Sequence, residues 1–263
     1  MKLSYWNQQF QMTQVLPDFH SYLASMKRRS ASVTSAFQRL TYGDDPRQYV
    51  EWTGTPSKDR PLPVFIHGGY WRALTAQDHR FVLPAIQSAT GAVANLEYRL
   101  LPHVTLRDIV MDAVQGLHAL SERFHCPLVV IGHSAGGHLA AMAARQIPDR
   151  IVAAIGISGL YDLTPLQWSF LREEVGLTLA DLRGQSPQDV WEGHDASHIT
   201  VAVGANETPE FLRQSHMFAN AHGALSLTIP DAHHMTVLDD LADPQGVMIA
   251  HLTTILATSH SNL

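Results

Sequence analysis

The chain has 263 residues, of which 45% are hydrophobic, and a formal net charge of −6 at neutral pH. This length suffices for one large α/β domain, and the acidic balance provides no basic surface for nucleic acid or anionic lipid. No apolar run is long enough for a membrane span. The first residues are polar and lack the continuous apolar stretch of a secretion signal, so we expect a cytoplasmic protein. Cys126 is the single cysteine, which excludes an intrachain disulfide.

Residues 1–40 contain aromatic and apolar side chains such as Trp6, Phe10, Phe19 and Leu23. We expect an N-terminal helical segment there, made of one or two helices packed on the domain. Helices in this place can border a pocket.

From residue 49 onward, short apolar runs alternate with longer amphipathic stretches, which predicts strands and helices in turn. The predicted strands are 49–53, 62–66, 92–96, 127–131, 151–157, 198–203 and 225–229, and the main predicted helices are 75–88, 106–124 and 210–222. This alternation predicts an α/β fold whose mostly parallel central sheet is covered by helices on both faces. The alternation breaks over 160–197, which we predict to be a small helical cap inserted into a single domain spanning 1–263.

The sequence Gly132-His133-Ser134-Ala135-Gly136 follows a predicted buried strand and opens a predicted helix. A serine on such a sharp turn is exposed to a base, and small residues are needed where the strand and the helix crowd the turn. The motif in this context predicts a nucleophile elbow with Ser134 as the nucleophile.

A second motif, His67-Gly68-Gly69-Tyr70-Trp71, directly follows the strand predicted at 62–66. Acyl transfer needs backbone N–H groups aimed at the developing oxyanion, and adjacent glycines let the main chain come close. We therefore predict an oxyanion hole formed by Gly68, Gly69 or Tyr70 together with Ala135.

A serine nucleophile needs a histidine base, which in turn needs a carboxylate to orient it. In hydrolases with such an elbow, the acid and then the base follow the serine on loops after later strands. Glu207 and His234 fit that order. Asp162 is the rival acid, and the adjacent His233 is the rival base.

Together these motifs resemble the kynurenine formamidase (arylformamidase) group among the hormone-sensitive-lipase-like α/β-hydrolases. Further matches are Tyr98-Arg99-Leu100, 158–163 and 207–215, so that the resemblance runs from about residue 42 to the end of the chain. It implies an α/β-hydrolase fold, with the acid at Glu207 and the base at His234. That group usually has Asp as the acid and Phe after the base, whereas this chain has Glu207 and Met235.

By this resemblance the substrate is an aryl formamide such as N-formyl-kynurenine, cleaved through an acyl-enzyme. The aryl group is expected to lie against Tyr70, Trp71, Tyr161 or Trp168. A carboxylesterase for short acyl esters uses the same machinery and is the alternative, and a non-catalytic binding protein of this fold is an alternative of another class. The 16 histidines show no tight ligand spacing, so no metal or cofactor is expected. The expected partner is a small-molecule substrate, with a homodimer left open.

Overall fold

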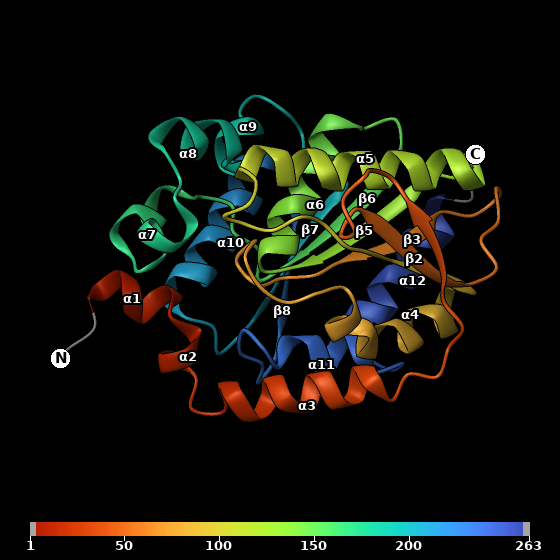
Figure 1. Cartoon of the computed structure of the whole chain (residues 1–263), viewed down its shortest axis with the longest axis horizontal. Coiled ribbons are helices and arrows are strands. Elements are labelled where there is room, and N and C mark those ends of the chain that lie inside the picture. Colours follow the sequence, from red (N-terminus) through yellow and green to blue (C-terminus); the bar gives the residue numbers. More distant parts are fainter. Residues whose placement is uncertain (1–3, 260–263) are drawn as a thin grey trace.

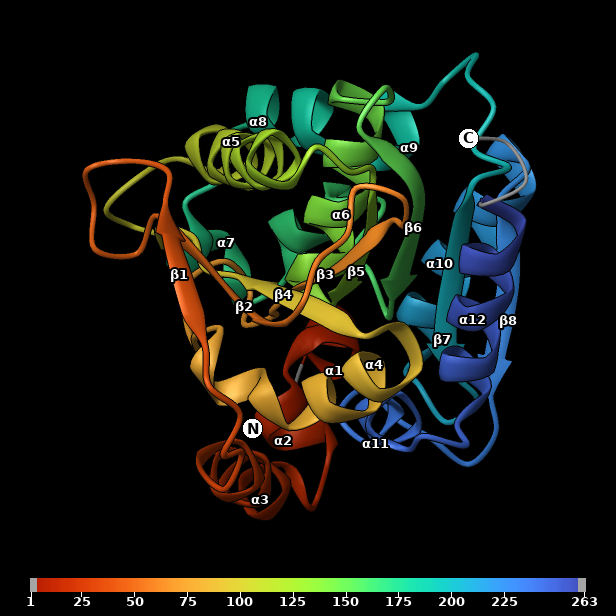
Figure 2. The ribbon, with the colours of Figure 1, turned by 90° about the vertical axis from the view of Figure 1, so that its right-hand side faces the viewer.

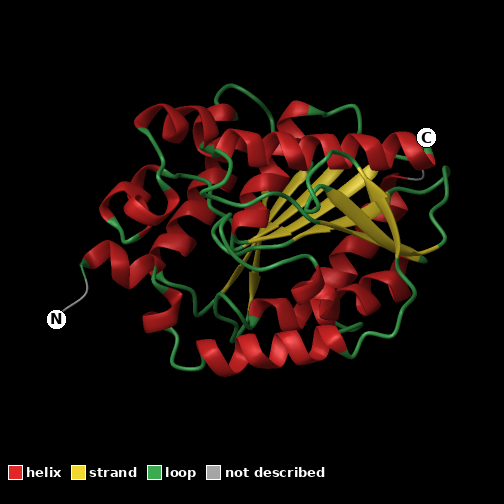
Figure 3. Cartoon of the chain, in the orientation of Figure 1, coloured by secondary structure: helices red, strands yellow, loops and turns green. Residues whose placement is uncertain are grey.

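A twisted central sheet organises the computed structural model, which describes residues 4–259 (Figures 1 and 3). Within those residues the sheet has eight strands in the order β1-β2-β4-β3-β5-β6-β7-β8. The strands are β1 (Gln38–Thr41), β2 (Tyr49–Gly54), β3 (Leu62–Ile66), β4 (Ala92–Leu96), β5 (Leu128–His133), β6 (Ile151–Ile157), β7 (Ile199–Gly204) and β8 (Leu225–Ile229).

The direction of the strands decides where the functional loops meet. Strands β4, β3, β5, β6, β7 and β8 run parallel to one another, whereas β2 pairs antiparallel with β4, and β1 pairs antiparallel with β2 at the edge of the sheet. The carboxyl ends of the parallel strands therefore share one edge of the sheet. In open α/β sheets this edge is where ligands bind.

Helices cover both faces of the sheet, as the view in Figure 2 shows. The core on one face includes α5 (Leu106–Phe124), α6 (Ala135–Gln146) and α10 (Pro209–His222). The core on the other face includes the 3₁₀ helix η1 (Gln77–Val82) with α4 (Leu83–Thr90), α11 (Val237–Ala242) and α12 (Val247–Ser259). The predicted α/β architecture is confirmed, because every strand from β3 to β7 is almost wholly buried, as a sheet covered on both sides requires.

The N-terminal segment consists of three helices, α1 (Tyr5–Phe10), α2 (Met12–Val15) and α3 (Phe19–Ala31). The prediction of a helical segment up to residue 40 is wrong at its end, since β1 begins at Gln38. This edge strand pairs on one side only and its side chains are mostly exposed, so no apolar alternation marks it in the sequence. Residues 1–3 of the predicted segment lie outside the described residues.

Four short helices lie between β6 and β7, where the cap was predicted. They are η2 (Thr164–Trp168), α7 (Leu171–Val175), α8 (Leu179–Gln185) and α9 (Pro187–Val190). Among the described helices, none combines the length and the apolar character that crossing a membrane requires.

Candidate active site

Ser134 stands on a sharp turn between β5 and α6. Its backbone angles, φ 56° and ψ −117°, are unusual for a residue with a side chain. The turn is so tight that a Cβ atom on Gly132 would lie 2.0 Å from the carbonyl oxygen of Gly136. The local sequence thus folds as the predicted elbow, because only glycine fits where the strand passes the helix.

A continuous hydrogen-bonded chain joins Ser134, His234 and Glu207. His234 Nε2 lies 3.0 Å from Ser134 Oγ, and His234 Nδ1 lies 3.2 Å from Glu207 Oε1. The three side chains come from loops after β5, β8 and β7, and all three are buried. This is the arrangement in which a histidine can take a proton from a serine while a carboxylate fixes its tautomer.

The two rival residues have other partners. Asp162 accepts a hydrogen bond from the backbone N–H of Thr164 at 3.0 Å and one from the Arg213 guanidinium at 2.8 Å. The His233 ring points away from the serine, since its Nε2 lies 3.2 Å from Asp18 Oδ2. The structure therefore brings Glu207 and His234 to Ser134, and not Asp162 or His233.

The loop after β3 passes close to the serine. A Cβ atom on Gly68 would lie 3.1 Å from Ser134 Cβ, and Gly69 has a φ of 110°, which favours glycine. Within residues 4–259, the backbone N–H groups of all four predicted residues, Gly68, Gly69, Tyr70 and Ala135, donate no hydrogen bond to another backbone group. Free N–H groups at this position are what binding of an oxyanion requires.

The next two residues of this loop are strained. Tyr70 and Trp71 have φ values of 50° and 58°, in the left-handed region that costs a non-glycine residue about 1–3 kcal/mol. Two anchors hold them there. The Tyr70 hydroxyl donates to the carbonyl of Phe10 at 2.7 Å, and the Trp71 ring is fully buried and packs edge-on against His138.

A buried polar network supports the same loop from behind. His67 Nδ1 donates to the carbonyl of Gly68 at 2.8 Å, and its Nε2 lies 3.1 Å from Glu97 Oε1. Burial opposes the ionisation of Glu97, but His67 and Arg47 beside it outweigh burial and hold the pKa of this carboxyl below its usual range. An ionised carboxylate at this place binds the loop through several donors, including the Ala76 N–H.

A cavity of about 280 Å³ opens above Ser134 and His234. Its volume is slightly below the roughly 300–1,000 Å³ typical of small-molecule sites. Most of the wall is apolar or aromatic and comes from the N-terminal segment, the glycine loop, the cap and the loop after β8: Met12, Phe19, Leu23, Tyr70, Ala73, Leu74, Phe170 and Met235.

Of the four aromatic residues predicted to contact the substrate, Tyr70 alone lines this cavity. The prediction is wrong for the other three. Trp71 and Tyr161 are fully buried in the core, where the Tyr161 hydroxyl donates to the carbonyl of Gly156 at 3.0 Å. Trp168 is 58% exposed and stacks on Trp6 at the surface. In a strained loop and an irregular cap, sequence spacing does not tell which way a ring points.

Sequence reasoning did not assign the residues that replace them. Phe19 and Leu23 lie one turn apart on α3, so that both reach the cavity from the same face of the helix. The spacing of these two residues predicts that this face of the helix is buried. It does not predict that the face lines a cavity. Phe170 lies two residues after Trp168 and points inward instead.

Two further histidines line the cavity, and both are buried. Burial, with His67 adding to it, lowers the pKa of His79 to about 4. Burial and the neighbouring His234 also bring the pKa of His133 well below the usual value, and its Nε2 donates to the carbonyl of His234 at 2.8 Å. His79 and His133 are therefore neutral at physiological pH. Through its bond to the main chain, His133 braces the loop that carries His234.

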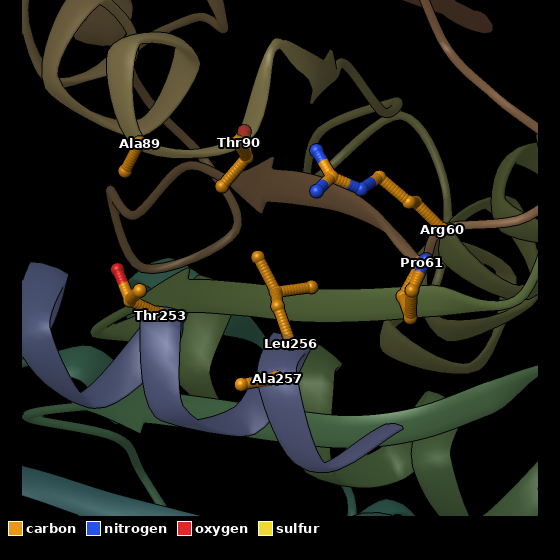
Figure 4. A pocket seen from close by; sticks show the side chains of 7 residues that line it. All are labelled: Arg60, Pro61, Ala89, Thr90, Thr253, Leu256 and Ala257. Carbon is orange, nitrogen blue, oxygen red and sulfur yellow. The ribbon is translucent and has the colours of Figure 1, made fainter. Parts of the chain in front are cut away.

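A second cavity, of about 220 Å³, lies far from the serine at the amino end of β3 (Figure 4). Side chains from α4, α12 and the loop before β3 line it, and Arg60 is its one charged residue. It contains no nucleophile with a base. Among the described residues, no group of three or more His, Cys, Asp or Glu side chains is arranged to hold a metal ion.

Known proteins resemble this chain over long stretches. A kynurenine formamidase from Danio rerio is 26% identical over 276 residues, covering 97% of this chain and 94% of the relative. Esterase LipC from Mycobacterium tuberculosis is 29% identical over 148 residues, covering 48% of this chain and 37% of the relative.

Among solved structures, a protein from Silicibacter sp. TM1040, provisionally assigned as a thioesterase, superposes with a TM-score of 0.78. It is 28% identical, and the match covers 94% of this chain and 96% of that protein. Residues 63–222, from β3 to the end of α10, match the model of the alpha/beta hydrolase fold family. With its elbow, glycine loop and parallel sheet, the chain belongs to the alpha/beta hydrolase fold family.

Proposed function

We propose that this protein is a serine hydrolase that cleaves the formamide of an arylamine, such as N-formyl-kynurenine, through an acyl-enzyme. The observation that carries the proposal is the hydrogen-bonded chain from Ser134 through His234 to Glu207, which opens into a largely apolar cavity. A non-catalytic binding protein of this fold has no need of the chain, the elbow and the free N–H groups together.

In the proposed reaction, Ser134 Oγ attacks the formyl carbon while His234 Nε2 takes the hydroxyl proton. The oxyanion that develops is bound by the N–H of Ala135 and those of Gly69 and Tyr70, each worth about 3 kcal/mol of transition-state stabilisation. His234 then gives its proton to the leaving arylamine. Water attacks the formyl-enzyme by the same route in reverse and releases formate.

The shape of the cavity supports an aryl leaving group. The rings of Phe19, Tyr70 and Phe170 line the same cavity as Ser134 and His234. Aromatic rings bind well between such side chains, and a formyl group needs little room of its own. The similarity to a formamidase over 97% of the chain supports the amide rather than the ester as substrate.

A carboxylesterase for short acyl esters is the second candidate. It is favoured by the similarity to an esterase and by the apolar wall, which also suits an acyl chain. The same serine, base and oxyanion hole serve both reactions, so that only turnover separates them.

The test compares kcat/KM on N-formyl-kynurenine with kcat/KM on p-nitrophenyl acetate, with Ser134→Ala as the control. We expect a preference for the formamide, and a loss of activity in the variant by a factor on the order of 10³ or more. Ester turnover with negligible formamide cleavage would assign the protein to the carboxylesterases. Failure of a serine-directed fluorophosphonate to label the parent protein would contradict both activities.

A further inference from the structure

The N-terminal segment (residues 4–31) makes hydrogen bonds or polar contacts with three loops of the proposed machinery, those after β3, β7 and β8. In Figure 1 it runs in red along one end and the lower side of the molecule, with α3 beside α11. Met12, Phe19 and Leu23 supply part of the cavity wall. The segment also makes polar contacts with these loops. Lining the cavity with apolar side chains would not require such contacts.

The loop that carries Glu207 is bound at two points by Gln9, which is itself buried. The Thr208 hydroxyl donates to the main-chain carbonyl of Gln9 at 2.9 Å. The backbone N–H of Glu210 donates to the side-chain Oε1 of Gln9 at 3.1 Å. Gln9 therefore binds the residue directly after Glu207 and the first turn of α10.

This contact takes the place of an ordinary helix cap. The first N–H groups of a helix lack partners inside the helix, and the N-cap side chain usually accepts from one of them. Thr208 is the N-cap of α10, but its side chain makes no such bond and is engaged with Gln9 instead. The α10 N-terminus is thus capped by a residue about 200 positions earlier in the chain.

The other two loops are bound by neighbouring parts of the segment. The Phe10 carbonyl accepts from the Tyr70 hydroxyl at 2.7 Å, next to the proposed oxyanion hole. Asp18 Oδ2 lies 3.2 Å from Nε2 of His233, the residue before His234. One short segment therefore joins the acid loop, the glycine loop and the base loop.

We propose that Gln9 is a positioning residue of the active site: by capping α10 from outside, it fixes the loop that holds Glu207 against His234. This inference rests on the proposed function. Glu207 does not line the cavity, so a displaced acid loop weakens the activation of Ser134 and leaves the substrate-contacting wall in place. Loss of the Gln9 contacts is therefore expected to lower kcat and to leave KM nearly unchanged.

The test uses Gln9→Leu, which removes the capping oxygen, and Thr208→Val, which removes the hydroxyl but keeps the shape. Thr208→Ser keeps the hydroxyl and is the rescue variant. Thr254→Val is the matched control, because it removes an exposed threonine hydroxyl on α12, far from the site. The readouts are kcat and KM on p-nitrophenyl acetate, the rate of fluorophosphonate labelling and the thermal unfolding midpoint.

We expect Gln9→Leu to lower kcat and the labelling rate about tenfold, and Thr208→Val to lower both about threefold, with KM within about twofold. Thr208→Ser and Thr254→Val should match the parent. Folded Gln9→Leu and Thr208→Val proteins with parental kcat and labelling would overturn the proposal, as would a change in KM alone. If Gln9→Leu does not fold, the comparison of Thr208→Val with Thr208→Ser tests the proposal instead. A parent that is not labelled would instead refute the proposed function.

Discussion

The elbow at Ser134 and the N-terminal segment line the same cavity, but they are held in place by contacts of different kinds. The elbow is built from residues adjacent in the chain, where a strand, a tight turn and a helix follow one another. The N-terminal segment reaches the site through Gln9, whose hydrogen-bond partners lie 199 and 201 positions away. A local motif can thus be found from sequence, whereas a wall made of distant residues becomes visible only when the chain has folded.

The largest expected effect comes from removing the carboxylate that lies between the two regions. Glu207→Gln leaves the shape but not the charge that holds the tautomer of His234, so we expect kcat to fall by roughly 10³-fold. The measurement is kcat on either substrate, with Asp162→Asn as the matched control. If Asp162→Asn were the more damaging change, the assignment of the acid to Glu207 would be wrong.

A change of pH tests one buried histidine in the helix of the elbow and one in a helix that packs against the N-terminal segment. His138 lies on α6 of the elbow and His79 on η1 beside α3, and burial lowers the pKa of each to about 4. Both rings are neutral in the folded protein, while the unfolded chain takes up protons below its ordinary value of 6.5. Stability is therefore present above that value and is lost as the pH falls towards 4.

When the pH is lowered from about 7.5 to about 5, each of these histidines should lower the free energy of unfolding by roughly 2 kcal/mol, because it takes up a proton in the unfolded chain but not in the folded protein. Urea unfolding at the two pH values measures the loss. In His138→Phe, the loss of unfolding free energy between the two pH values should be smaller by the roughly 2 kcal/mol that one histidine contributes. The same reduction is expected for His79→Phe. Unfolding free energies that do not change over this interval would mean that these rings are not buried as neutral groups.

The smallest expected effect concerns the cavity wall. Phe19→Ala removes a ring contributed by the N-terminal segment, so we expect KM for an aryl formamide to rise about tenfold with little change in kcat. Trp168→Ala is the matched control, because it removes a large ring that lies at the surface. Equal KM values for the two variants would show that the segment does not contribute to substrate binding.

Much of the fold could be predicted from the sequence, and the reason is visible in particular elements. Strands β3, β4, β6 and β8 begin and end where their apolar runs predict. The edge strand β1 could not be predicted, because exposed side chains carry no burial pattern. The predicted helix over 75–88 is in fact a 3₁₀ helix followed by α4, since Pro84 allows an α-helix to begin there.

For the candidate site, the limit of prediction is the orientation of side chains. Ser134 and the glycine loop could be identified because their motifs are contiguous. Tyr161 and Trp168 were misassigned because one turns into the core and the other towards solvent, and neither direction is encoded by spacing.

By itself, the sequence determined the parallel sheet, the elbow and the chain order of serine, acid and base, since these depend on local patterns and on the strand order that such patterns imply. Only the tertiary structure decided that Glu207 and not Asp162 lies beside His234, and that the N-terminal helices cap α10 and line the cavity. The physical reason is that a hydrogen bond requires two groups within about 3 Å, and residues some 200 positions apart meet at that distance only in the folded chain.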